Sequence, residues 1–113
     1  MSDPKLERLR ALAGEIEAEM RRLGLWLDDP PAEEEVLGGG AFGMGTVPFD
    51  TWIQVVFVTR LRQVADGLFP IPSNSSVGTQ AVREWDAAGP PDRDRLLGLI
   101  LDVDDLIEGR EPA

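Results

Sequence analysis

The sequence predicts an all-α protein: a four-helix bundle in which a long loop joins the first two helices. Three observations predict this fold. Apolar residues recur at spacings of three and four along separate stretches, proline and glycine stand at the ends of those stretches, and convincing strand patterns are missing. We therefore expect one α-helical domain over residues 1–113, with helices near residues 4–23, 48–65, 77–88 and 92–108.

The first helix has the clearest pattern. Its apolar stripe steps by three and four through Leu6, Leu9, Ala13, Ile16, Met20 and Leu23. Asp3 is a suitable N-cap, Pro4 fits the first turn because its missing N–H costs nothing there, and Gly24 provides a left-handed stop. The charged side chains of this helix, Glu19 among them, are interpreted as an ordinary solvated surface.

Residues 26–47 lose the helical period and are expected to form a long loop. Loops beyond about 12–15 residues are uncommon in compact domains and are often functional or mobile. Trp26, Phe42 and Met44 give this loop apolar side chains with which to lie across the helices. Asp28 and Asp29 are interpreted as part of the turn that leaves the first helix rather than as a catalytic pair.

The loop contains the stretch GGGAFGMG over residues 38–45, which has the spacing G-x-G-x-x-G. A phosphate-binding loop of that kind needs a strand before it and a helix start directly after it. Here an acidic, proline-rich segment comes first, and no lysine follows to pair with a phosphate. We interpret the glycines as a turn with unusual backbone dihedrals, not as a nucleotide site.

The second stretch begins at Pro48 and is rich in β-branched residues, which favours a strand. Its spacing favours a helix, because residues at intervals of three and four are apolar over a run longer than a strand, as far as Gly67: Phe49, Trp52, Ile53, Val56, Phe57, Leu61 and Val64. Arg60 falls on the same stripe and would enter an apolar environment, where an arginine needs a partner. Two interpretations stay open. Either the stem of Arg60 packs while its head reaches solvent or a carboxylate, or Arg60, Gln54 and Trp52 line a pocket under the loop for an anionic or peptidic ligand.

The last two helices are shorter amphipathic stretches. The third is expected to turn Ala81, Val82 and Trp85 inward and to end at Gly89. The fourth carries an apolar stripe and has Asp92 and Asp94 near its positive N-terminal end; the stripe is Leu96, Leu97, Ile100, Val103, Leu106 and Ile107. Its acidic residues lack the ligand order of an EF-hand loop and are interpreted as a solvated face: Asp102, Asp104, Asp105 and Glu108.

The composition excludes several kinds of chemistry. The chain has no Cys, no His and no Tyr, so we expect no disulfide, no thiolate nucleophile, no structural zinc site and no Ser-His or Cys-His dyad. The only lysine, Lys5, lies near the N-terminus, where a buried lysine base is not expected. We predict that the protein holds no metal and no cofactor and is not an enzyme.

The charge indicates the kind of partner. A formal net charge of −10 repels phosphate backbones and anionic membranes, and it favours a basic protein instead. No apolar run approaches the roughly 20 residues of a membrane span, and the N-terminus lacks a secretory signal pattern, so a cytoplasmic protein is expected. The possibility that two copies form a homodimer through an apolar stripe also stays open.

Several segments resemble the YqcC-like family of small bacterial proteins. They are Leu25-Trp26 with Pro30 a few residues later, and residues 42–47, 52–61 and 70–72. The spacing of Thr46, Trp52, Gln54 and Arg60 matches the most recognisable segment of that family. The chain departs from the family pattern with Gly45, Val55 and Thr59, where the family has Asp, Trp and Pro. If that Asp acts together with the threonine, the pairing is lost here.

The resemblance implies an all-α bundle and an association with a tRNA pseudouridine synthase. It does not imply the synthase itself, because the chain is too short and lacks the strands expected of that fold. An acidic helical protein suits a basic RNA-modifying enzyme, since complementary charge steers association. We predict a non-enzymatic interaction module, or alternatively a small-ligand-binding domain with a pocket under residues 26–47; the candidate binding residues are Trp26, Phe42, Thr46, Trp52, Gln54 and Arg60.

Overall fold

A computed structural model describes residues 3–37, 48–72, 74–86 and 90–109 of the chain. These residues form helices, turns and connecting segments, with no strand among them, so the all-α class is confirmed. The elements in chain order are α1 (Pro4–Arg22), α2 (Glu33–Leu37), α3 (Phe49–Trp52), the π-helix η1 (Ile53–Val58), α4 (Thr59–Ala65), α5 (Val77–Asp86) and α6 (Asp94–Glu108).

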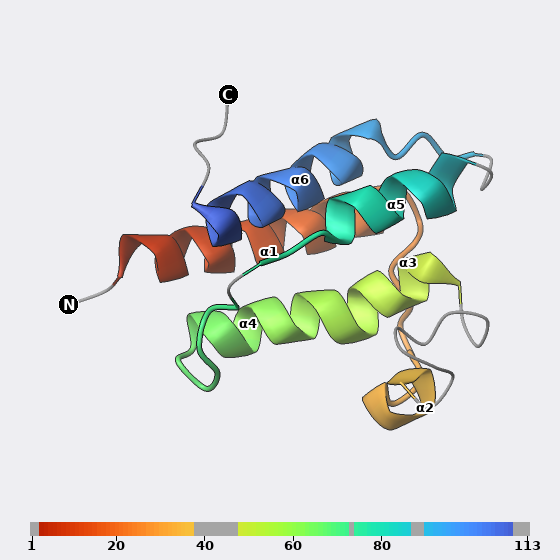
Figure 1. The fold of residues 1–113 in the computed structure, drawn as a ribbon. Helices are drawn as coiled ribbons and strands as arrows, with labels where there is room; N and C mark the ends of the chain where they lie inside the picture. The colour runs from red at the N-terminus through yellow and green to blue at the C-terminus, as the bar shows by residue number, and fades with distance from the viewer. Residues whose placement is uncertain (1–2, 38–47, 73, 87–89, 110–113) are drawn as a thin grey trace.

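Four long helical segments alternate in direction along the chain, as Figure 1 shows. They are α1, the continuous run from α3 through η1 to α4, then α5 and α6. Helix α1 contacts α6, α4 and η1, and α5 lies along α6. The short helix α2 packs against η1 and lies on the side of the central run away from α5 and α6 (Figure 1).

The first helix forms as its pattern predicts and ends one residue earlier, at Arg22. Asp3 caps it by accepting a hydrogen bond from the backbone N–H of Lys5 at 2.8 Å. The predicted stripe is buried together with Leu12, while Leu6 and Leu23 are partly buried. The prediction for Glu19 is wrong: only 4% of this residue is exposed. It lies on the side of α1 that α6 covers, because Arg95 of α6 reaches its carboxylate at 3.7 Å.

The central run contains the largest departure from the predicted regular helix. Its middle six residues, Ile53–Val58, form a π-helix whose side chains are all buried. In a π-helix the hydrogen bond runs from residue i to i+5, so each turn holds more residues than in an α-helix. Residues beyond it are rotated about the axis relative to a continuous α-helix. Arg60 lies at the exposed margin of its predicted stripe: its side chain is 48% exposed, whereas Leu61 and Val64 stay buried.

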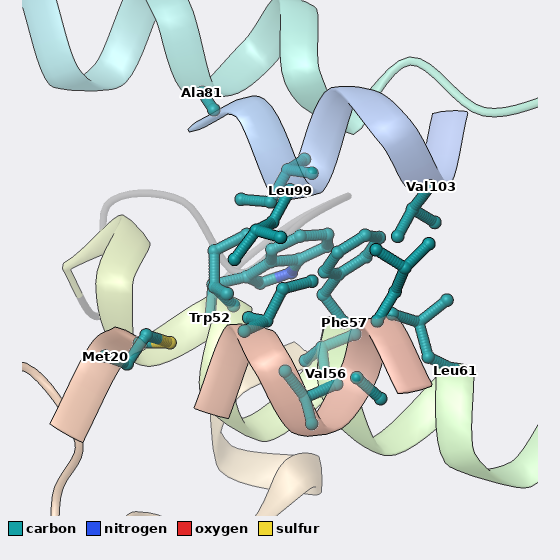
Figure 2. Packing of buried hydrophobic residues seen from close by; sticks show 14 of the residues in the cluster. Met20, Trp52, Val56, Phe57, Leu61, Ala81, Leu99 and Val103 are labelled. Carbon is teal, nitrogen blue, oxygen red and sulfur yellow. The ribbon is translucent and has the colours of Figure 1, made fainter. Parts of the chain in front are cut away.

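The core is built around aromatic side chains of the central run. Phe49 stacks on Trp52 with ring centroids 5.6 Å apart, and Trp52 stacks on Phe57 at 6.4 Å. Figure 2 shows Trp52 and Phe57 pointing into the space that Leu99 and Val103 of α6 also fill. Such aromatic burial contributes a large share of a small core's stability.

The pairing of α5 with α6 corrects two predictions. Val82, predicted to point inward, is 50% exposed, because α5 turns Gly78 and Ala81 toward the core instead. Asp104, predicted on a solvated face, is 3% exposed. Its carboxylate accepts hydrogen bonds from Ser75 Oγ at 2.5 Å and from the backbone N–H of Gly78 at 2.7 Å. It therefore caps the start of α5, where orphan N–H groups need acceptors.

The segment predicted as a long loop contains a short helix. Helix α2 covers residues for which the sequence predicts no regular structure, and its Val36 is fully buried. The glycine pattern over residues 38–45, with Phe42 and Met44, lies outside the described residues, as does Thr46. None of the described helices combines the length and the apolar character that crossing a membrane requires.

Candidate functional site

Two of the predicted binding residues, Trp26 and Gln54, line one cavity. The cavity has a volume of about 300 Å³ and lies between the segment that follows α1 and the central run; its walls are Trp26, Pro30, Pro31, Glu33, Gln54, Val55, Thr59 and Arg62. We call it the Trp26 cavity. It lies under the described part of the segment predicted to roof a pocket, and its volume is at the lower end of the range for small-ligand sites.

Gln54 positions the roof of this cavity. Its side-chain oxygen accepts a hydrogen bond from the backbone N–H of Leu27 at 2.8 Å, and its side-chain nitrogen donates to the Leu27 carbonyl at 2.9 Å. The residue is 5% exposed. These hydrogen bonds are partly buried, and one amide side chain satisfies both backbone groups of Leu27. Gln54 thus fixes the chain that leaves α1 against the π-helix.

The charges near the Trp26 cavity are arranged in pairs. Glu17 of α1 accepts hydrogen bonds from Arg21 at 2.8 Å and from Arg62 at 2.7 Å. These two guanidinium groups hold the pKa of the Glu17 carboxyl below its ordinary value. The Arg21 guanidinium also lies over the Trp26 ring, 5.3 Å from its centroid. Both guanidinium groups near the Trp26 cavity are therefore engaged with the same carboxylate.

Arg60 and Trp52 lie outside this cavity. Arg60 pairs with Glu33 at 2.8 Å, and its guanidinium lies 5.5 Å from the centre of the Phe69 ring. It lines a separate apolar cavity of about 160 Å³ that includes Phe57. Arg60 thus adopts the arrangement in which its head reaches solvent and a carboxylate.

Trp52 is buried and lines a third cavity, of about 400 Å³, together with Phe49 and the first turns of α5. The structure therefore distributes Trp52, Gln54 and Arg60 over three cavities.

A second polar cluster has no signal in the sequence. Asp50 in α3 accepts hydrogen bonds from Arg93 Nε at 3.1 Å and from Trp85 Nε1 at 2.9 Å, and its other oxygen accepts from Arg93 at 3.0 Å. The Arg93 side chain is 9% exposed. A bidentate arginine–carboxylate pair of this kind has a fixed geometry. No sequence spacing links these residues, since Asp50 and Arg93 are 43 positions apart.

Trp85 and Arg93 of this cluster line a fourth cavity, where α5 ends and α6 begins. Its volume is about 380 Å³, and it is lined by Val82, Trp85, Asp86, Pro91, Asp92, Arg93, Asp94 and Leu97. We call it the α5–α6 groove. Within the described part of the chain, no group of three or more Asp and Glu side chains is arranged to hold a metal ion.

Comparisons with known proteins agree with this architecture. The structure superposes on the solution NMR structure of YqcC from E. coli with a TM-score of 0.78, 23% sequence identity and coverage of 98% of this chain and 92% of that one. At this identity the likeness shows the fold. An uncharacterized protein of Haemophilus influenzae is 26% identical over 74 residues, which cover 63% of this chain and 70% of the relative. The family model DUF446, described as tRNA pseudouridine synthase C, matches residues 8–106. The chain therefore belongs to this YqcC-like DUF446 family.

Proposed function

We propose that the protein is a non-enzymatic interaction module that binds a basic partner protein, and that this partner is a tRNA pseudouridine synthase. The observation that carries the proposal is the surplus of carboxylates, 21 acidic against 11 basic residues. Eight arginines are already paired with carboxylates at 2.5–3.7 Å. The remaining acidic side chains leave a negative field that attracts a basic protein and repels bare RNA.

The family description supports the identity of the partner. It names a tRNA pseudouridine synthase, an enzyme that must bind polyanionic RNA. Such an enzyme carries basic surface, and an acidic module complements it. The ionisable groups of the Trp26 cavity are tied in arginine–glutamate pairs, an arrangement that supports a binding role.

Mixing the purified chain with the tRNA pseudouridine synthase encoded in the same genome tests the proposal. We expect a complex by size-exclusion chromatography with light scattering at low salt, weakening as the salt concentration rises. A native-lysate pull-down at moderate salt should recover the same enzyme. If no complex forms at low salt and the pull-down recovers no specific protein, the partner role is wrong. Pseudouridine formation in tRNA by the chain alone would overturn the non-enzymatic role.

The Trp26 cavity supports a second function, the binding of a small ligand. It combines an indole, two prolines and the Arg62 guanidinium in one concave site, which is the mixture of apolar walls and few polar groups found in ligand sites. A thermal-shift screen against a metabolite panel tests this function. A hit whose shift is lost in Trp26→Ala or Arg62→Ala, with Arg83→Ala as the unaffected control, would support it. A panel without such a hit would reject it.

A further inference from the structure

Of the four cavities described above, the α5–α6 groove is lined by the most carboxylates. Three carboxylates line it, at the last residue of α5 and around the start of α6: Asp86, Asp92 and Asp94. All three residues are exposed. The helix end and the helix start lie at the same end of the bundle, as Figure 1 shows. The fold thus gathers these charges from two different elements.

Arg93, the arginine in the groove wall, does not neutralise the rim formed by Asp86, Asp92 and Asp94. Arg93 is already bound by both oxygens of Asp50, so the pair is neutral in sum. Asp92 also contributes to the raised pKa of Arg22, whose larger cause is Glu19. The Arg22 guanidinium is itself paired with Glu19 at 2.5 Å, and Glu19 also faces Arg95 at 3.7 Å. Arg93, Arg22 and Arg95 are therefore engaged with other carboxylates.

The floor of the groove is apolar. Val82 is 50% exposed, an unusual position for a valine on a packed helix. Trp85 and Leu97 are partly buried beside it and line the same space. An exposed apolar floor with a charged rim is the arrangement found where a partner's side chains dock.

We propose that the α5–α6 groove is the docking site for an amphipathic, arginine-bearing segment of the partner protein. A guanidinium group of the segment pairs with the rim carboxylates, and neighbouring aliphatic side chains cover Val82 and Leu97. The planar fork of arginine matches carboxylates bidentately, which an ammonium group does not. This inference rests on the proposed function and names the surface and the partner chemistry.

Charge complementarity selects this groove over the other cavities. The cavity beside Trp52 and Phe49 has Arg83 and no carboxylate among its described walls. The Trp26 cavity has Glu33, but that carboxylate is paired with Arg60, and Arg62 lies in the same wall. The small apolar cavity has Arg60 and no carboxylate among the described residues that line it. Arg62 is itself paired with Glu17 and Arg60 with Glu33, so among the described residues neither of these two linings carries the surplus of carboxylates found in the groove.

The three tryptophans of the chain report on three of these cavities separately. Trp85 lines the groove, Trp26 lines its own cavity and Trp52 lines the third. In a ¹⁵N-labelled sample each gives one indole N–H signal, assigned by single Trp→Phe variants. The probe is a short amphipathic peptide of leucine and arginine, and its control has citrulline, the neutral analogue, at every arginine. We expect the arginine peptide to shift the Trp85 signal and the citrulline peptide to leave it in place.

Two charge-matched variants complete the test. The triple variant Asp86→Asn, Asp92→Asn, Asp94→Asn keeps side-chain size, and asparagine can still accept the hydrogen bond that Asp92 accepts from the N–H of Asp94 at 2.8 Å. Its control is Asp28→Asn, Asp29→Asn, Glu34→Gln, three exposed carboxylates elsewhere with the same loss of charge. We expect the groove variant to bind the peptide about tenfold more weakly, as the loss of three exposed ion pairs implies, and the control variant to bind as the wild type does.

The outcomes separate the groove from the proposed function. Three results would overturn the groove as the docking site. The arginine peptide could shift the Trp26 or Trp52 signal instead of the Trp85 signal. It could bind equally to both triple variants, or it could fail to bind the wild type. A response of Trp85 to Mg²⁺ or Ca²⁺ alone at peptide-binding ionic strength would overturn the groove as well. The synthase complex can still form in each case. Conversely, if the peptide binds at Trp85 but no complex with the synthase forms, the groove is supported as a docking site and the synthase is rejected as its partner.

Discussion

Gly78 occupies the tightest position of the α5–α6 contact. A Cβ built there would meet the side chain of Leu101 and would lie 2.9 Å from Asp104 Oδ2, whereas a Cβ on Gly98 would have no atom within 4 Å. The Leu101 tip can move, but the Asp104 carboxylate is held by its hydrogen bonds to Ser75 and to the Gly78 N–H. Position 78 therefore requires glycine, because there is no room for a side chain.

Gly78→Ala and Gly98→Ala should change stability in opposite directions. We expect Gly78→Ala to lower the free energy of unfolding by about 1–3 kcal/mol, because it overpacks the contact. Gly98→Ala should raise it by about 0.5–1 kcal/mol, because alanine is the better helix former in open space. Urea unfolding followed by circular dichroism measures both. Equal effects of the two substitutions would show that α5 does not approach α6 this closely.

Gln54 anchors the segment that follows α1 through its two hydrogen bonds with Leu27. Replacing it with leucine keeps the size but leaves the N–H and the carbonyl of Leu27 without their partner. We expect Gln54→Leu to lower the free energy of unfolding by about 1–3 kcal/mol, the net contribution of two partly buried hydrogen bonds. The Trp26 fluorescence should shift because the segment loses its anchor. Gln63→Leu on the neighbouring α4 is the control, since the side-chain oxygen of Gln63 has no hydrogen-bond partner in the described structure.

At the scale of elements, Glu17 connects α1 to α4 through Arg62. Its pKa is lowered, chiefly by the hydrogen bond from Arg21 and then by that from Arg62. A carboxyl with a depressed pKa in the folded state adds stability above its unfolded value, about 4.3, and loses it as the pH falls through the folded value. This element contact therefore weakens in acid.

Glu17→Gln should flatten the acid side of the stability curve. At pH 7 we expect it to lower the free energy of unfolding by about 1 kcal/mol, the scale of partly exposed pairs. Below about pH 4 the difference from the wild type should shrink, because the wild-type carboxyl is then protonated. Urea unfolding across pH 3–7 measures this, with Glu7→Gln as an exposed control. A difference that grows in acid would contradict the assignment.

The π-helix is a feature of the central run that the sequence does not predict. The sequence places Arg60 on the stripe of Trp52 and Val56 by counting in steps of a regular α-helix. Six residues instead adopt the π conformation, which holds more residues in each turn. Periodicity identifies the helix and its burial, but a change of hydrogen-bond register within a uniformly apolar run leaves no mark in the sequence.

At the scale of the whole molecule, the net charge of −10 acts against the compact state. Like charges repel one another in the folded chain, and added salt shortens the distance over which this repulsion acts. Most of the ion pairs that salt also weakens have an exposed arginine side chain, and such pairs contribute little. Salt therefore relieves more repulsion than it removes attraction.

Salt should stabilise the protein. Raising NaCl from roughly 10 mM to roughly 150 mM shortens the screening length from about 30 Å to about 8 Å, and we expect Tm to rise by a few degrees. Differential scanning calorimetry measures it. The variant Asp28→Asn, Asp29→Asn, Glu34→Gln, which carries less negative charge, should gain less. A fall in Tm with added salt would mean that the ion pairs outweigh the repulsion.

The sequence by itself determined the all-α class, the first residues of the long helices within about two positions, the cap at Asp3 and most of the core stripe of α1. These features depend on residues a few positions apart, so local periodicity and capping are enough to predict them. Only the tertiary structure decided that Gln54 holds Leu27, that Asp50 binds Arg93 and Trp85, and that Asp104 caps α5. These partners are 26–43 positions apart, and they meet because of how the helices pack and how the π-helix turns the central run.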